Sequence, residues 1–356
     1  MIPLFRTQPN LLRAPFRGGT WRVLTGFCLT AFFLVAAPAW SESSGPGEKS
    51  VPGGPASAGR HADAFVVNPA VSILLSRNIR PYFDALDGIS DGVADGLPDA
   101  KIHRTVFTLS DYPPERAARL EEKLKALDPD LLITVGPEAL RMVELRLDRL
   151  VPRLLYSMIL HPRSILGPDA AVCGVAMDIP LIEQLRTIRS ALPGIRLLGL
   201  LYDPVYNETR FRRAKAALKN AHFATPLVLT PIPVSLKDIR RKLDRSWEHI
   251  DALWFIPDQT VKGESLIRQI LKESISRNIP AIGFNRLFYD SGATLSFVLD
   301  YKEIGRKTGR MAVRYLHTGD CRPAGPAYQA WINSRVVRRI GATVRLDAEA
   351  GIVEGP

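Results

Sequence analysis

A repeated alternation of short apolar runs and amphipathic segments constrains this chain more than any other feature. Predicted strands occupy residues 71–75, 102–109, 131–135, 152–158, 196–202, 227–230, 252–256 and 281–284, and most of them are apolar runs. The segments between them have helical spacing, as in residues 113–127, where Ala117, Leu120 and Leu124 fall on one face. This alternation is typical of parallel sheets covered by helices on both faces. Because about ten strands are more than one sheet usually holds, we predict an α/β protein with two doubly wound lobes.

The length and composition agree with such a fold. The chain has 356 residues, enough for two domains. Hydrophobic residues make up 46% and charged residues 23%, which argues against a mostly disordered, collagen-like or multi-span membrane protein. The net charge is +11, but Arg6, Arg13, Arg17 and Arg22 lie in an N-terminal segment without acidic residues. The remaining excess is spread along the chain, so we predict no nucleic-acid partner.

The N-terminal segment has the pattern of an export signal. Residues 1–22 carry only positive charge, residues 23–37 are apolar, and Ala37-Pro38-Ala39 follows. We predict a cleaved signal peptide at residues 1–41 and a periplasmic location. The alternative is a retained anchor, for which the apolar run is short. Residues 42–65 are rich in Ser, Gly, Pro and Ala and are predicted to form a flexible linker.

Three cysteines occur in the chain, and Cys28 lies in the predicted signal peptide. Cys173 and Cys321 remain, which allows at most one disulfide in an oxidising compartment. Nothing in their spacing demands a bond. We expect two packed thiols and leave their pairing open.

Polar residues follow several predicted strands directly. In open α/β sheets, ligands bind beyond the carboxyl ends of the strands. The strand-end residues are Ser76 to Asn78, Gly136 to Glu138, Ser157, Tyr202 to Pro204, Pro257 to Thr260, and Gly283 to Asn285. Hydroxyls, amides and carboxylates suit the recognition of a small polar molecule, and helix N-termini favour its anionic groups. Each residue alone could be a helix N-cap, but the set predicts a shared ligand-binding cleft.

Other candidate sites are interpreted as structural. The sequence has no nucleophile elbow, phosphate loop or dinucleotide fingerprint, so we predict neither catalytic residues nor a cofactor. Gly88, Gly92 and Gly96 are interpreted as loop, and Asp87, Asp91 and Asp95 as a solvated turn. We predict no metal site, because no pair of histidines has metal-ligand spacing. The histidines are His61, His103, His161, His222, His249 and His317.

A basic stretch at residues 210–215 has a helical pattern. Phe211, Ala214 and Leu218 share one face, which we expect to be buried. The arginines between them are predicted to face water rather than phosphate.

Several segments together resemble the periplasmic ABC transporter substrate-binding proteins of the tryptophan and tyrosine type. They are KALDPDLLITVGPEAL at 125–140, CGV at 173–175, LGLLYDP at 198–204, DALWFIPDQTV at 251–261 and GATLSFVLDYKEIGRKTG at 292–309. The resemblance implies a periplasmic-binding-protein-like fold with three hinge crossovers, near Cys173, near Leu299 and Asp300, and near 321–324. Lobe 1 would then comprise residues 66–172 and 301–320, and lobe 2 residues 173–299 and 325–356.

The resemblance also implies a function and a site. The protein would be a monomeric solute-binding component of an ABC importer, not an enzyme, and would deliver a small polar metabolite, an amino acid or related organic acid, to permease and ATPase subunits. The alternative is a periplasmic sensor that docks on a membrane signalling partner. The implied ligand-binding residues are Ser76, Arg77, Gly136, Pro137, Ser157, Tyr206, Asn207, Asp258, Thr260, Phe284 and Asp300.

Within this set we expect backbone N–H groups at 136–138 to bind an anionic group. Asp258 or Asp300 would bind an ammonium, and Tyr206 or Phe284 would form an apolar wall. Departures from the family pattern concern the loops that determine specificity. Residues 77–80 read Arg-Asn-Ile-Arg, and Leu160-His161-Pro162 replaces a familiar Ser-Asp-Pro. An aromatic amino acid therefore cannot be assumed as the ligand, and the added arginines favour an acidic one.

Overall fold

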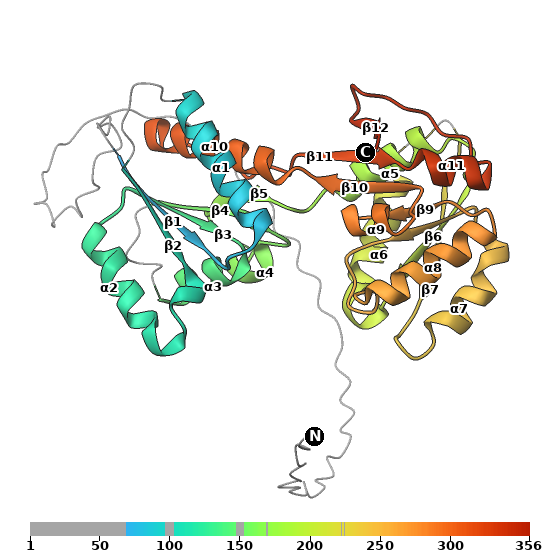
Figure 1. Ribbon diagram of the computed structural model, residues 1–356, viewed down its shortest axis with the longest axis horizontal. Coiled ribbons are helices and arrows are strands. Elements are labelled where there is room, and N and C mark those ends of the chain that lie inside the picture. The colour runs from blue at the N-terminus through green and yellow to red at the C-terminus, as the bar shows by residue number, and fades with distance from the viewer. Residues whose placement is uncertain (1–68, 97–102, 147–152, 169, 222, 224) are drawn as a thin grey trace, which may run out of the picture. The chain divides into compact units, whose positions relative to one another are not determined.

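The computed structural model describes residues 69–96, 103–146, 153–168, 170–221, 223 and 225–356. The predicted signal peptide at 1–41 and linker at 42–65 lie outside the described residues. In this part of the chain, the strands form two predominantly parallel sheets, one of five strands and one of seven (Figure 1). The α/β class and the two-lobed organisation predicted from the sequence are confirmed.

The first sheet has the strand order β2-β1-β3-β4-β5, and all its pairs are parallel. Its strands are β1 (Ala70–Leu75), β2 (His103–Thr108), β3 (Leu131–Val135), β4 (Leu154–Ile159) and β5 (Cys173–Ala176). The associated helices are α1 (Arg80–Gly96), α2 (Ala117–Leu127), α3 (Pro137–Arg146), α4 (Arg163–Leu166) and α10 (Tyr301–Thr318). Helices α1 and α10 share one buried cluster with β1 and β3, whereas α2 and α3 pack in another. The central strand β3 is buried along its whole length because helices cover both faces.

The second sheet has the order β12-β11-β10-β9-β8-β6-β7. Its strands are β6 (Leu197–Tyr202), β7 (Val228–Pro233), β8 (Ala252–Phe255), β9 (Ala281–Gly283), β10 (Leu295–Leu299), β11 (Tyr328–Ile332) and β12 (Ile352–Glu354). The helices are α5 (Leu181–Ala191), α6 (Pro204–Lys219), α7 (Ile239–Ser246), α8 (Glu264–Ser276), α9 (Arg286–Asp290) and α11 (Ser334–Ile340). Short 3₁₀ turns occupy Leu109–Asp111, Pro114–Arg116 and Trp247–His249. Strand β11 runs antiparallel to β10, the one departure from parallel pairing among the described strands.

The chain passes from one sheet to the other three times, after β5, after β10 and after α10. The predicted boundary at Cys173 is wrong in one respect. Strand β5 pairs with β4, so Cys173–Ala176 belong to the first sheet and the first passage comes after Ala176. The rest of the predicted lobe division stays a prediction. Among the described residues, no helix is both long and apolar enough to cross a membrane.

Helices α1 and α10 lie side by side on the first sheet, at a crossing built from glycines (Figure 1). A Cβ added at Gly88 would overlap the carbonyl oxygen of Lys302, and one at Gly309 would overlap that of Ile89. The interpretation of Gly88, Gly92 and Gly96 as loop is therefore wrong. These residues lie in the continuous helix α1. The absence of a side chain at Gly88 and Gly92 allows the backbone of α10 to approach closely.

The predicted solvated turn at Asp91 and Asp95 is wrong for the same reason. Asp91 lies 3.0 Å from Lys302 Nζ and 3.2 Å from Arg306 Nη2. Asp95 Oδ2 lies 3.8 Å from Arg306 Nε. These ion pairs join α1 to α10 along the rim of the glycine crossing. The hydrogen bond from Lys302, together with the charge of Lys302 and the contact with Arg306, lowers the pKa of Asp91.

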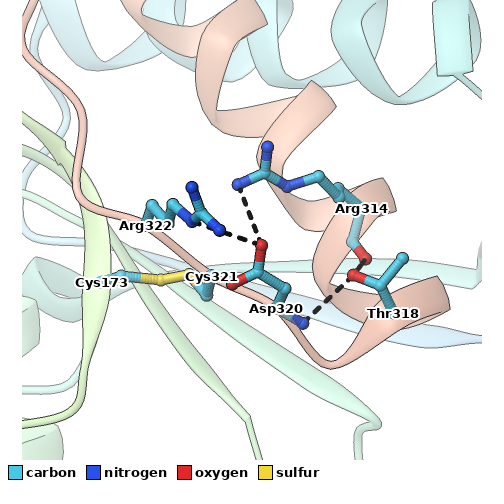
Figure 2. The surroundings of a disulfide bond; sticks show 6 residues. All are labelled: Cys173, Arg314, Thr318, Asp320, Cys321 and Arg322. Atoms are coloured by element: carbon cyan, nitrogen blue, oxygen red, sulfur yellow. Dashed lines mark hydrogen bonds and ion pairs between the residues drawn. A yellow bond between two sulfur atoms is a disulfide. The ribbon is translucent and has the colours of Figure 1, made fainter.

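Cys173 and Cys321 form a disulfide, with their Cα atoms 6.0 Å apart (Figure 2). The expectation of two packed thiols is thus wrong. The bond ties β5 to the segment that follows α10. Ala324 on this segment also donates to Gly174 O at 2.9 Å and accepts from Ala176 N at 3.0 Å. The third passage between the sheets is therefore anchored to β5 by covalent and backbone bonds.

Candidate functional site

The loops after β6 and β8 are held together by the carboxylate of Asp258. Its Oδ2 accepts hydrogen bonds from Asp203 N at 2.8 Å and Asn207 Nδ2 at 2.7 Å, and its Oδ1 accepts from Thr260 N at 2.7 Å. Thr260 Oγ1 also donates to Asp203 Oδ2 at 3.1 Å. Asp258 is only 8% exposed. Because both its oxygens already have protein donors, Asp258 positions Asn207 rather than offering a free carboxylate.

A chain of polar contacts joins His161, Asp178 and Arg210. The backbone N–H of His161 donates to Asp178 Oδ2 at 2.5 Å, and His161 Nδ1 lies 2.9 Å from Asp178 Oδ1. Nη1 of Arg210 lies 3.2 Å from His161 Nε2. His161 follows β4 with a left-handed φ of 52°. This backbone conformation directs the residue's N–H and ring to the same carboxylate.

These contacts set the charge of Asp178. Burial alone would raise the pKa of this carboxyl, but the hydrogen bonds from His161 and the charge of Arg210 outweigh it. The pKa of Asp178 consequently lies below its ordinary value, and the group is ionised at neutral pH. Burial lowers the pKa of Arg210, partly opposed by Asp178.

Arg210 departs from the predicted solvated face of α6. Phe211 and Ala214 are buried as expected, and Arg212 is exposed and pairs with Glu208 at 2.9 Å. The Nε of Arg210, however, is buried and has no hydrogen-bond partner among the described residues. A buried N–H without a partner is costly unless a ligand or water supplies one. Arg210 is therefore a candidate ligand-binding residue.

Three adjoining cavities surround these groups. The first, the outer cavity, has a volume of about 600 Å³ and contains His161, Asp178, Tyr206, Arg210 and Arg213 in its lining. The second, the loop cavity, has about 550 Å³ and shares His161, Tyr206 and Asn207 with the first. The third, the inner cavity, has about 160 Å³ and shares Asp178 and Arg210 with the outer cavity. Because neighbouring cavities share residues, they form one connected candidate site.

The inner cavity has mainly apolar walls. Its lining residues are Leu160, Met177, Asp178, Ile179, Gln184, Arg210, Pro257, Phe284, Asn285, Phe297, Leu299 and Tyr301. Two groups of them, residues 177–179 and the pair Leu299 and Tyr301, lie where the chain passes between the sheets. A ligand in this cavity would consequently contact the passages as well as the strand ends.

Four of the predicted site residues line these cavities, namely Tyr206, Asn207, Asp258 and Phe284. Tyr206 is 61% exposed and borders the outer and loop cavities. Phe284 borders the loop and inner cavities and packs against Phe288 with 4.7 Å between ring centroids. Both border the candidate cavities, and their role as an apolar wall for a ligand stays a prediction.

The other predicted site residues line none of the three cavities. They are Ser76, Arg77, Gly136, Pro137, Ser157, Thr260 and Asp300. Their participation in ligand binding stays a prediction, but several have structural partners that account for them.

Two of these residues cap helices, which is the N-cap alternative considered for strand-end residues. Ser76 Oγ accepts from Ala139 N at 2.9 Å in the first turn of α3, and Asp300 Oδ1 accepts from Glu303 N at 2.9 Å in α10. Ser157 is fully buried, with its hydroxyl 2.9 Å from that of Thr308.

The backbone N–H groups at 136–138, predicted to bind an anion, are only partly available to a ligand. Gly136 N donates to Ser157 O at 2.9 Å, so this N–H is not available to a ligand. Pro137, the next residue, has no N–H to donate. Arg77 is exposed and pairs with Glu138 at the start of α3.

Sequence reasoning missed His161, Asp178 and Arg210 as site residues. His161 was noted as a departure from the family pattern, and Arg210 lies within the basic stretch, but neither signal indicated that the fold would join them. Asp178 carried no signal, because it follows a four-residue strand that the apolar pattern did not predict. Among the described residues, no group of three or more His, Cys, Asp or Glu side chains could hold a metal ion.

Comparison with known proteins decides the family. The family model described as ABC transporter substrate binding protein matches residues 82–324. This chain belongs to that family. The resemblance seen in the sequence is confirmed, and the family is one of substrate-binding proteins. A search of curated proteins found no match.

Solved structures of substrate-binding proteins share the fold of this family member. An L-Trp complex from Streptococcus pneumoniae is 20% identical, with a TM-score of 0.52, and covers 80% of this chain and 99% of its own. A ligand-free, open substrate-binding protein from Clostridium difficile is 17% identical, with a TM-score of 0.61, and the match covers 81% of this chain and 99% of its own. A periplasmic ribose ABC transporter protein from Conexibacter woesei is 13% identical, with a TM-score of 0.50, and the match covers 82% of this chain and 100% of its own. At these identities the likeness concerns the fold alone.

Proposed function

We propose that this substrate-binding protein is the exported solute receptor of an ABC importer. It binds a small polar metabolite, an amino acid or related organic acid, in the connected cavities around Arg210. It acts as a periplasmic monomer without enzymatic activity and delivers its ligand to the permease and ATPase subunits of the inner membrane. The family assignment supports the transport role, and the basic, export-like N-terminus supports the location.

The observation that carries the ligand-binding part is the position of Arg210. Its buried Nε has no partner among the described residues, and it borders both the outer and the inner cavity. Ligand pockets typically combine apolar walls with a few placed polar groups. The connected cavities have this composition at the carboxyl ends of strands, where α/β folds bind ligands.

The passages between the sheets supply a mechanism for reporting occupancy. Residues 177–179, together with Leu299 and Tyr301, line the inner cavity and lie where the chain passes between the sheets. A ligand that contacts both passages favours the arrangement in which those contacts are made. Such differential binding shifts a conformational equilibrium toward the form that a permease recognises.

A thermal-shift screen of the mature protein tests the proposal. The panel comprises amino acids, small organic acids, sugars and polyols. A ligand at 100 times its dissociation constant adds about 2.7 kcal/mol to the free energy of unfolding, which is a clear rise in Tm. Stabilisation by one chemical class supports a solute receptor. The absence of any shift across the panel contradicts it.

A further inference from the structure

The carboxylates that line the connected cavities are already engaged by the protein. Among the described residues, they are those of Asp178 and Asp258. Asp258 accepts hydrogen bonds on both oxygens. Asp178 Oδ2 accepts the backbone N–H of His161, and the ring Nδ1 of His161 lies 2.9 Å from Oδ1, which is buried without a well-aligned hydrogen bond among the described residues. An incoming ammonium group would have to displace a protein donor from Asp258, or the ring of His161 from beside Asp178.

The contacts of His161 determine which groups remain available. When the proton of the His161 ring is on Nδ1, the ring faces Asp178 with an N–H, and its Nε2 accepts from Arg210 Nη1. One tautomer thus satisfies both contacts. This leaves the edge formed by Nε and Nη2 of Arg210, on which Nε has no partner among the described residues. A guanidinium edge of this kind matches the two oxygens of a carboxylate.

The charge around the outer cavity favours an anion. Its lining includes Arg163, Arg210 and Arg213 but a single acid, Asp178. Arg163 is turned toward its own loop, where it donates to Pro168 O at 2.5 Å and Ala170 O at 3.0 Å. Arg210 is the cation that borders the inner cavity as well. An anionic group at Arg210 would therefore neutralise a partly buried charge that Asp178, separated from it by the ring of His161, balances only in part.

The inner cavity determines which ligand body can accompany the anionic group. Its walls include Leu160, Ile179, Phe284, Phe297 and Leu299, and its volume is about 160 Å³. An apolar protein cavity of roughly 150 Å³ is large enough for benzene. The space beside Arg210 thus fits one ring or one branched aliphatic group.

We infer that the ligand is a small monocarboxylic acid with an apolar body and no α-ammonium group, whose carboxylate binds the Nε–Nη2 edge of Arg210. This inference rests on the proposed function and narrows its ligand class from amino or organic acids to organic acids. The apolar body lies in the inner cavity.

Titration calorimetry with matched probes tests the inference. The first set is 3-phenylpropanoate, phenylalanine and 3-phenylpropanamide, and the second is 4-methylpentanoate, leucine and 4-methylpentanamide. Within each set the body is constant, while the ammonium is added or the carboxylate charge removed. We expect at least one acid to bind, and its amino acid and amide to bind at least about tenfold more weakly. The amide has no negative charge to pair with Arg210, and the ammonium group of the amino acid finds no available carboxylate beside it.

Variants assign the effect to one side chain. Arg210→Met keeps the apolar stem and should weaken binding of the acid by at least about tenfold. Arg212→Met, at an exposed residue of α6 that lines none of the three cavities, should change it less than about threefold. Arg210→Lys keeps the charge but not the fork and should fall between wild type and Arg210→Met. It also serves as the test if the methionine variant does not fold, as monitored by thermal unfolding.

The outcomes separate the inference from the proposed function. Tighter binding of the amino acid, equal binding of the amide, or an unchanged affinity in both Arg210 variants overturns the inference. Binding of a sugar or polyol alone overturns it too but leaves the solute-receptor function standing. If no compound of the wider panel binds, both are contradicted.

Discussion

Nη1 of Arg210 lies 3.2 Å from Nε2 of His161, although the two residues are 49 positions apart in the chain. Arg210 comes from α6, beside the second sheet, and His161 from the turn after β4 of the first sheet. The imidazole contacts Asp178 on its other side. A histidine thus connects a partly buried carboxylate to a partly buried guanidinium, and this chain of contacts defines the candidate site.

Replacement of Asp178 by asparagine should make stability depend less on pH. The folded-state pKa of Asp178 lies below its unfolded value, so its ionised form stabilises the fold above about pH 4. That contribution disappears as the pH falls through the folded pKa. We expect Asp178→Asn to lower the free energy of unfolding by about 1 kcal/mol at pH 7, and the difference from wild type to narrow in acid. Urea denaturation at several pH values measures both.

Asp290→Asn is the matched control for Asp178. Asp290 is exposed and lies 3.5 Å from Arg286 in a surface ion pair. Such pairs contribute little to stability, so its replacement should leave the denaturation midpoint nearly unchanged. A pH-independent loss of stability in Asp178→Asn would show that the ionised carboxylate is not the stabilising group.

Replacement of Asp258 by asparagine should loosen the loop cavity. The amide N–H₂ would face donors that now bond to a carboxylate oxygen, including Asn207 Nδ2 and Asp203 N. We expect a loss of about 1–3 kcal/mol in the free energy of unfolding, together with weaker ligand binding. Asp244→Asn, which makes the same change at an exposed position of α7, should alter neither quantity. Equal stability of wild type and Asp258→Asn would contradict the positioning role.

The glycine crossing of α1 and α10 should not tolerate one added methyl group. In an isolated helix, alanine is more favourable than glycine by about 1 kcal/mol. A Cβ at Gly92 would nevertheless overlap the carbonyl oxygen of Arg306. We expect Gly92→Ala to lower the free energy of unfolding by about 1–3 kcal/mol or more, because the two backbones must separate. Chemical denaturation measures the change.

Gly194→Ala is the control for the crossing, since no heavy atom lies within 4 Å of a Cβ built there. It should stay within about 0.5 kcal/mol of wild type. Stabilisation by Gly92→Ala would mean that helix propensity outweighs the close approach, and that the crossing is looser than the structure indicates.

Reduction of the disulfide should destabilise the protein. The bond between Cys173 and Cys321 closes a loop of 148 residues in sequence separation. Removing a cross-link of this kind costs about 2–5 kcal/mol, mainly because the unfolded chain gains freedom. Wild type should therefore unfold at a lower temperature in reductant, whereas the double variant Cys173→Ala and Cys321→Ala should not respond to it. An unchanged Tm of wild type on complete reduction would contradict a stabilising bond.

Much of the fold could be predicted because the pattern is local. Runs such as residues 131–135 are apolar except for Thr134 and end at Gly136, and the structure has a strand at Leu131–Val135. Strands β5, β10, β11 and β12 were not predicted. Strand β5 has four residues, too few for a periodic pattern, and its place is fixed by pairing with β4 and by the distant Ala324.

The site depended on contacts that local patterns cannot contain. Helical spacing correctly turned Phe211 inward, but it could not show that His161 and Asp178 would meet the neighbouring Arg210. The glycines of α1 posed a similar problem, since they weaken an isolated helix and are explained only by Lys302 and Arg306 of α10. Among the strand-end residues, Ser76 caps a helix and Asp258 borders a cavity, although both follow an apolar strand, so their local sequence does not distinguish the two roles.

A crystal structure of the protein with bound 3-phenylpropanoate tests ligand binding at Arg210 most directly. The predicted result is a carboxylate within hydrogen-bond distance of Arg210 Nε, with the ring among Leu160, Phe284 and Phe297 in the inner cavity. A bound molecule that contacts Ser76 and Gly136 instead, with the Nε of Arg210 still without a partner, would contradict the account.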